Sequence, residues 1–267
     1  MAETDWLKLW SDLTQANFRA DDTNLPRRYQ VHTEKKQERP DPLLDYLLTL
    51  VDPEMSVLEI GPGNGRWTIP LARKAARVTV VEPSAEMRSI LHEKVVSAGL
   101  ANVSVLSEKW ETVKSSGHDL CVCAHSMYRS PDLAFFVRKM EAHAGQLCAM
   151  SIRIPPADGI MAELSGKVHD LRQDSPDAII AFNALYTMGI NVNIRVEEGI
   201  VHWENRSLEE AFARAKRHLR LENSVQYDSL IKTTLQKRLV NNEGVLRWPD
   251  GMRSALLYWN PQSVSVK

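Results

Sequence analysis

Cysteine is scarce in this chain of 267 residues. The three that occur, Cys121, Cys123 and Cys148, all lie in apolar, strand-like runs. A disulfide framework is therefore implausible, and reduced thiols inside a core are the expected state. Cys121 and Cys123 would share one strand face, but two thiols without further partners at metal-binding spacing do not make a zinc site, so we expect no metal.

Excess charge and long apolar runs are also missing. The chain has 33 Lys and Arg residues against 34 Asp and Glu residues, so no net field attracts it to nucleic acid or to an anionic membrane. Residues 1–10 carry acids and no signal-peptide core, and no segment reaches the length of a membrane span. We expect a soluble, cytoplasmic protein that acts on a small molecule, with neither nucleic acid nor membrane as partner; a homodimer is left open.

The most informative stretch that is present runs from Val57 to Gly65 and reads VLEIGPGNG. Its apolar start predicts a buried parallel strand, and the three alternating glycines permit a tight turn and a close approach of the backbone to a ligand. The next strand lies in the segment VTVVEPS, residues 78–84, and ends at Glu82, where a carboxylate can accept hydrogen bonds from both hydroxyls of a ribose. A dinucleotide-binding loop would need its third glycine at position 66, which is Arg66.

The order Glu-x-Gly-x-Gly-x-Gly also places Glu59 beside the ligand, which suits an ammonium group and disfavours a pyrophosphate. On these residues the chain resembles the class I S-adenosylmethionine-dependent methyltransferases, in particular the small-molecule branch of the ubiquinone/menaquinone type. The resemblance is clear from Leu43 to Ile154 and only topological beyond. It implies S-adenosylmethionine as cofactor, S-adenosylhomocysteine as product, and methyl transfer by direct displacement.

Apolar segments of strand and helix type alternate along the middle of the chain, which predicts an α/β fold with a Rossmann-like, doubly wound, mainly parallel sheet. Residues 42–155 would form the cofactor-binding core. Residues 1–41 would form an amino-terminal helical extension or lid. Residues 156–267 would complete the sheet and carry a helical insertion that covers the substrate.

Two segments near the carboxyl terminus complete the sheet that the resemblance implies, which has seven strands with the seventh antiparallel. Residues 191–198 (NVNIRVEE) and 254–259 (SALLYW) would fill the sixth and seventh places. In addition, Pro249, Asp250 and Gly251 predict a turn, so residues 244–261 would form a hairpin-like pair of strands.

The carboxyl ends of the first, second and fourth strands should converge on the cofactor. Glu82 is the expected ribose acceptor, and Glu59 the organiser of the amino-acid end.

Met87 would face adenine, with a plain core position as the alternative. Lys109 stands where the family usually carries an adenine-binding aspartate, and the neighbouring Trp110 would pack on adenine or belong to the core. The complete expected cofactor set is Glu59, Gly61, Pro62, Gly63, Gly65, Glu82, Pro83, Met87, Lys109, Trp110, Ala124 and His125.

His125 follows the fourth strand and is expected to line the site beside the reacting methyl group. It is also the candidate general base, because an imidazole can take a proton near neutral pH. Candidate substrate contacts are Tyr29, Tyr128 and Arg153, each with a packing or surface role as alternative, and His32 could join Tyr29 in a lid.

The methyl acceptor cannot be read from these residues. The segment AHSMYRS, residues 124–130, is not the N/D-P-P-Y motif of enzymes that methylate amino groups of adenine or glutamine, which counts against a nucleic-acid substrate. Two alternatives stay open: a methyltransferase for nucleic acid or protein, and a regulatory module that binds S-adenosylmethionine without catalysis.

Overall fold

The computed structural model describes residues 4–17, 40–114, 117–156, 158–171, 173–198, 202–249 and 251–262. These residues form two compact units. The first takes the described parts of Met1–Ile152, Ala178–Val196 and Ala255–Lys267, and the second takes those of Arg153–Asp177 and Glu197–Ser254.

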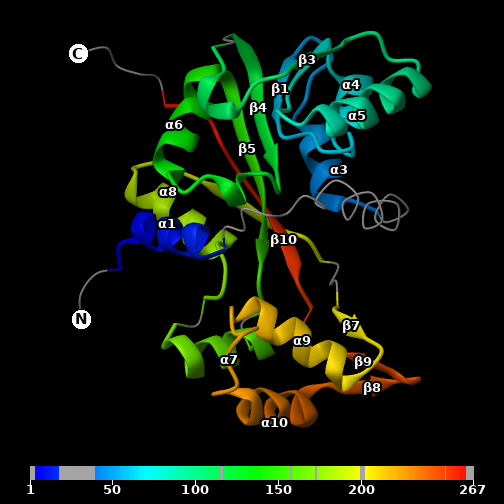
Figure 1. Cartoon of the computed structure of the whole chain (residues 1–267). Coiled ribbons are helices and arrows are strands. Elements are labelled where there is room, and N and C mark those ends of the chain that lie inside the picture. Colours follow the sequence, from blue (N-terminus) through cyan, green and yellow to red (C-terminus); the bar gives the residue numbers. More distant parts are fainter. Residues whose placement is uncertain are drawn as a thin grey trace. The chain divides into compact units, whose positions relative to one another are not determined.

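A seven-stranded sheet forms the centre of the first unit, in the order β3-β2-β1-β4-β5-β10-β6 (Figure 1). The pairs β1–β2, β1–β4, β2–β3 and β4–β5 are parallel, and β10 is antiparallel to β6. The predicted Rossmann-like sheet is therefore confirmed, including the sixth and seventh strands. The strands are β1 Ser56–Ile60, β2 Arg77–Val81, β3 Val103–Leu106, β4 His118–Ala124, β5 Ala144–Ile154, β6 Asn193–Val196 and β10 Arg253–Trp259.

Helices cover both faces of this sheet (Figure 1). One face carries α3 (Pro42–Thr49), α4 (Thr68–Lys74) and α5 (Ala85–Ser97), whose apolar residues share a core with the inner strands. The other face carries three more helices: α1 (Trp6–Asn17), α6 (Leu133–His143) and α8 (Ala178–Thr187). Since β1 is buried along its whole length, the strand that leads into the glycine loop is held rigidly from both sides.

The amino-terminal helix α1 is tied to the loop that follows β4. The indole Nε1 of Trp10, a fully buried residue, donates a hydrogen bond of 2.9 Å to the carbonyl O of Ser130. Ser130 directly follows a short 3-10 helix, η2 (Met127–Arg129), and a second such helix, η1 (Trp110–Thr112), follows β3. The greater part of the expected lid over residues 1–41 lies outside the described residues, so its role stays a prediction.

The second unit has a core of its own, in which α7 (Ile160–His169), α9 (Leu208–His218) and α10 (Asp228–Arg238) pack together. The helices of the expected insertion are thus present. A small antiparallel sheet accompanies them, which the sequence reading did not anticipate. Its strand order is β7-β9-β8, with β7 Glu204–Asn205, β8 Val240–Asn242 and β9 Val245–Arg247.

The predicted hairpin about Pro249 and Gly251 is wrong, because the two segments that it joined lie in different sheets: β9 pairs with β7 and β8, and β10 pairs with β6. The chain reverses earlier, at Glu243 and Gly244. Both have positive φ, 50° and 84°, as a tight turn between antiparallel strands requires. The amide of Gly244 donates to Asn241 Oδ1 at 3.0 Å, which stabilises that turn.

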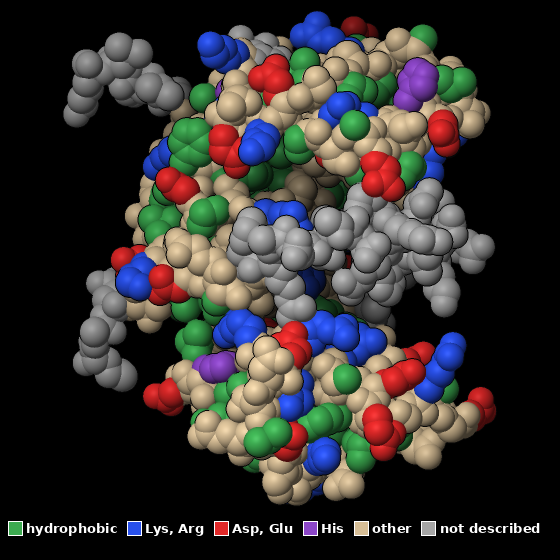
Figure 2. Space-filling view, in the orientation of Figure 1, with side chains coloured by type: hydrophobic (Ala, Val, Ile, Leu, Met, Phe, Trp, Pro, Cys, Tyr) green, Lys and Arg blue, Asp and Glu red, His purple; other side chains and the backbone are tan. Residues whose placement is uncertain are grey.

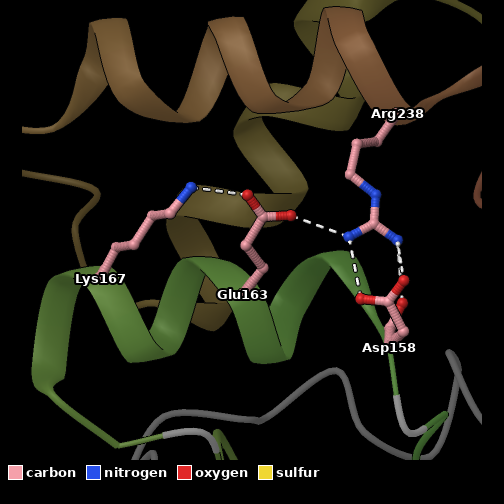
Figure 3. Close-up of polar contacts among 4 residues, drawn as sticks. All are labelled: Asp158, Glu163, Lys167 and Arg238. Carbon is pink, nitrogen blue, oxygen red and sulfur yellow. Dashed lines mark hydrogen bonds and ion pairs between the residues drawn. The ribbon is translucent and has the colours of Figure 1, made fainter.

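A network of ion pairs holds α7 to α10 (Figure 3). The guanidinium of Arg238 lies 2.8 Å from Glu163 and 3.3 Å from Asp158, and Lys167 reaches the other oxygen of Glu163 at 2.6 Å. Hydrogen bonds from Lys167 and Arg238 lower the pKa of Glu163. Its carboxylate therefore stabilises the folded unit above the pKa of the unfolded chain, and this contribution is lost as the pH falls through the lowered value.

We predict that Glu163→Gln destabilises the second unit by about 0.5–1 kcal/mol at neutral pH, a modest cost because the pair is partly exposed. Faster amide hydrogen exchange in α7 and α10 is the measurement. Glu198→Gln, an exposed position in the same unit, is the matched control. Equal exchange in both variants at neutral pH would contradict the prediction, as would an effect of Glu163→Gln that persists at a pH where carboxylates are protonated.

Candidate functional site

The carboxyl ends of β1, β2 and β4 meet at one edge of the sheet. Ile60 pairs with Val81 on one side and with Cys123 on the other. This register brings together three residues that are far apart in sequence. Gly61 follows β1, Glu82 follows β2, and Ala124 ends β4. The amide of Gly61 donates to the carbonyl O of Val81 at 2.9 Å and so continues the ladder into the loop.

Position 61 must be glycine for two independent reasons. Its φ is +65°, and a Cβ there would lie 2.5 Å from the Cβ of Ser126 and 2.7 Å from its Oγ. Ser126 cannot retreat easily, because its Oγ donates a 2.6 Å hydrogen bond to the carbonyl O of Ile60. The loop after β4 thus packs directly on the backbone of the glycine loop. Ser126 was not singled out by the sequence reading, because a serine in a loop carries no signal of such a contact.

Glu82 lies where the ribose acceptor was expected. The residue is 7% exposed, and its Oε1 accepts a 2.9 Å hydrogen bond from the amide of Ser84. Burial raises the pKa of Glu82, while hydrogen bonds from the amides of Ser84 and Gly63 and the charge of Arg88 act in the opposite direction. Arg88 is itself held by the carbonyls of Glu82 and Pro83, at 3.0 and 2.8 Å. The carboxyl group is therefore oriented by the backbone before any ligand arrives.

Glu59 is buried even more completely, with 1% of its surface exposed. Its Oε2 accepts a 2.6 Å hydrogen bond from Thr68 Oγ1 at the start of α4. Burial raises the pKa of Glu59 to about 7, and the bond from Thr68 only partly opposes this shift. Near neutral pH the side chain thus changes readily between a neutral and a charged form, and a cation placed beside it would favour the charged form.

An aspartate ahead of α3 fixes the chain that leaves the glycine loop. Asp41 caps α3 by accepting the amide of Leu44 at 3.1 Å. Its other oxygen accepts Nε1 of Trp67 at 3.0 Å and pairs with Arg66 at 2.9 Å. Arg66, which argued against a dinucleotide loop, therefore has a structural partner. The sequence signal for Asp41 was its place before Pro42, typical of a helix start, but nothing local indicated the second contact.

His125 and Tyr128 meet beyond the end of β4. Nδ1 of His125 lies 3.2 Å from the hydroxyl of Tyr128, and the two rings stack with centroids 6.2 Å apart. The amide of His125 donates to the carbonyl O of Ser151 on β5 at 3.0 Å. The fourth and fifth strands thus place a half-buried imidazole and a half-buried phenol at the edge where Gly61 and Glu82 also lie.

The remaining expected cofactor residues have varied surroundings. Met87 is buried in the first turn of α5, and its amide donates to the cap residue Ser84. Pro62 is buried, whereas Pro83 and Lys109 are exposed. Trp110 is 5% exposed, and its ring packs against Phe136 and His143 of α6. These contacts give Trp110 a core role whether or not it also touches a ligand.

The roles of two further expected substrate contacts stay predictions. Tyr29, with His32, lies outside the described residues. Arg153 belongs to the second unit. Within the described ranges, no group of three or more His, Cys, Asp or Glu side chains is arranged to hold a metal ion, and no helix is long and apolar enough to cross a membrane.

Residues 57–144, from β1 to the first residue of β5, match a family model described as "Methyltransferase domain". One curated relative, ribosomal RNA small subunit methyltransferase G of Nitrosospira multiformis, is 30% identical over 132 residues. This alignment spans 48% of the present chain and 58% of the relative.

Solved structures share the fold at low sequence identity. A Bacillus halodurans protein described as a candidate methyltransferase superposes with a TM-score of 0.58 at 13% identity, over 82% of this chain and 99% of the other. The YcgJ protein of Bacillus subtilis gives a TM-score of 0.56 at 14% identity, over 82% and 97% of the two chains. These likenesses support the fold assignment, and the residues that match the family model include the strands β1, β2 and β4, which build the candidate site.

The contact between Gly61 and Ser126 yields a stability prediction. Gly61→Ala should cost about 1–3 kcal/mol more than Gly99→Ala, because both positions have a φ of +65° but a Cβ at Gly99 meets nothing within 4 Å. Urea unfolding of the two variants measures the difference. Adding Ser126→Gly to Gly61→Ala should recover part of the loss, whereas equal costs for the two alanine variants would show that no clash occurs.

For Glu59 we predict a substitution that increases the stability of the fold. A carboxyl whose folded pKa is raised from 4.5 to about 7 holds its proton more tightly when folded, so stability is lost as the pH rises from about 4.5 to 7. Glu59→Gln, which keeps an acceptor for Thr68, should therefore be more stable than the wild type by roughly 2–3 kcal/mol at pH 8. The gain should vanish at pH 4. Chemical unfolding at the two pH values is the measurement, and a gain independent of pH would rule out the raised pKa as its cause.

Proposed function

We propose that this protein transfers the methyl group of S-adenosylmethionine to a small-molecule acceptor by direct displacement, because residues 57–144 match a methyltransferase domain. The observation that carries the proposal is the convergence of the glycine loop, the buried Glu82 carboxyl and the His125–Tyr128 pair at one edge of the sheet. In open α/β sheets ligands bind at this edge.

The residues present fit the cofactor. Glu82 would hold the ribose hydroxyls, because its carboxyl is already oriented by backbone amides. Glu59 would favour a cation at the amino-acid end, through its buried and readily ionised carboxyl. The three glycines would admit the ligand to the backbone, and Met87 would supply an apolar surface for adenine. The bound cofactor supplies an electrophilic methyl group on a sulfonium.

The protein's own contribution to the reaction would be alignment. Displacement at a methyl group requires the nucleophile, the methyl carbon and the sulfur to lie in line, with competing water excluded. Ala124 and His125 would line the space in front of the methyl group, and Tyr128 would face the acceptor. Where the acceptor has no proton to lose, His125 would only line the pocket, because alignment alone can account for much of the rate of such a displacement.

An RNA substrate is the second candidate function, because the curated relative is named as a ribosomal RNA methyltransferase. The charge of the chain favours the small molecule: Lys plus Arg nearly equals Asp plus Glu. Figure 2 shows side chains of both signs over the described residues of the face that it displays. Nucleic-acid binding proteins typically gather their Lys and Arg residues into one basic surface.

Incubation with labelled S-adenosylmethionine separates these candidates. Transfer to a low-molecular-mass fraction of a cell extract supports the proposal, and transfer to purified small ribosomal subunits or their RNA supports the alternative. Binding of the cofactor without any transfer in either case would favour a regulatory module.

The cofactor site itself is tested through Glu82. Glu82→Ala should weaken binding of S-adenosylhomocysteine by roughly 1.5–3 kcal/mol, the range for hydrogen bonds to a charged group, as measured by calorimetry. Glu93→Ala, an exposed position farther along α5, should bind like the wild type. If the folded wild-type protein is stabilised by NADH but not by S-adenosylhomocysteine, the proposed cofactor is wrong.

A further inference from the structure

Ser151, a residue of β5, lies on the far side of the His125 ring from Tyr128. Its Oγ is 3.3 Å from Nε2 of His125, and the residue is only 1% exposed. Ser151 also pairs with Ala124 in the sheet, and its carbonyl accepts the amide of His125. A serine on a rigid inner strand therefore contacts both the backbone and the ring of the histidine.

The backbone of His125 shows that this arrangement is imposed by the fold. Its φ is 57°, in the left-handed region, which is sterically unfavourable for a residue with a side chain. The other non-glycine residues with positive φ in the described structure follow helices or lie in the β8–β9 turn: Asp170, Arg220 and Glu243. Strain that persists at a site edge is typical of positions where a particular side-chain direction matters.

The ring of His125 thus lies between two hydroxyl groups of different acidity. The phenol of Tyr128, at Nδ1, is a far better proton donor than the aliphatic hydroxyl of Ser151, at Nε2. In a neutral imidazole one nitrogen accepts and the other donates. The favourable arrangement has Tyr128 donating to Nδ1, and Nε2–H donating to Ser151 Oγ.

We propose that Ser151 is a positioning residue that holds His125 as the Nε2–H tautomer and keeps Nδ1 as an acceptor toward Tyr128. When the acceptor carries a proton that must leave, that proton passes to the Tyr128 oxygen as the Tyr128 proton passes to Nδ1. The acceptor atom forms its bond to the methyl carbon, the carbon–sulfur bond breaks, and its electron pair stays on sulfur. The positive charge lost by the sulfonium appears on the imidazolium of His125, which still donates from Nε2 to Ser151.

This step rests on the proposed function, but the tautomer does not, so the two can fail separately. Nitrogen-15 NMR of the histidine ring in the full-length protein should show a protonated Nε2 and an unprotonated Nδ1 for His125. Ser151→Ala should lower the ratio of this tautomer to the other roughly fivefold, the effect of losing one ordinary hydrogen bond. Ser151→Thr, which keeps the hydroxyl, should restore the ratio, and Tyr128→Phe should leave Nε2 protonated.

A protonated Nδ1 in the wild-type protein would overturn the inference, as would an unchanged ratio in Ser151→Ala. Circular dichroism and thermal unfolding, measured on the same samples, should match the wild type in all three variants, which shows that they are folded. If the wild-type protein binds no S-adenosylhomocysteine but has the expected tautomer, the proposed function fails and the role of Ser151 stands.

Discussion

The hydrogen bond from Ser126 Oγ to the carbonyl O of Ile60, 2.6 Å long, is the contact on which the candidate site depends. It joins the loop after β4 to the end of β1, and it is compatible only with a residue at position 61 that has no side chain. This contact fixes the position of the glycine loop relative to the segment that carries His125 and Tyr128. The distance between the glycine loop and the His125–Tyr128 pair follows from this contact.

Two buried carboxyl groups at the same edge lower the stability of the fold near neutral pH. Glu59 and Glu82 are both nearly inaccessible, and burial raises the pKa of each. A core built only for stability would hold apolar residues at these places. Instead, Thr68 and the amides of Ser84 and Gly63 orient the carboxyl groups in advance. Such preorganisation reduces the entropy that is lost when a ligand binds.

The second unit depends on contacts of another kind. Its helices enclose a separate apolar core, and Arg238 connects α7 and α10 through two acidic partners. The small antiparallel sheet β7-β9-β8 belongs to the same unit, and backbone hydrogen bonds join its strands.

Local chemistry was sufficient to determine the strand β1, the glycine turn, the place of Glu82 and the helix that Ser84 begins. Each depends on residues close together in the chain: an apolar run, a backbone free to adopt positive φ, or a serine side chain that accepts an amide three residues later. The doubly wound, mainly parallel sheet could be predicted for the same reason, because β/α alternation constrains how strands are connected. The count of seven strands, with the seventh antiparallel, came from the family resemblance. The turn near Pro249 and Gly251 was misjudged because turn residues show where a chain can bend, and not which strands then pair.

Only the tertiary structure decided which distant side chains meet at the site. Ser126 contacts a carbonyl 66 positions earlier, and Ser151 contacts a ring 26 positions earlier. Asp41, a helix cap, also holds Arg66 and Trp67. A serine or an aspartate has the same local signature whether it caps a helix, faces water or bridges two strands. Its partner is set by strand order and register, which arise from the burial of the whole sheet.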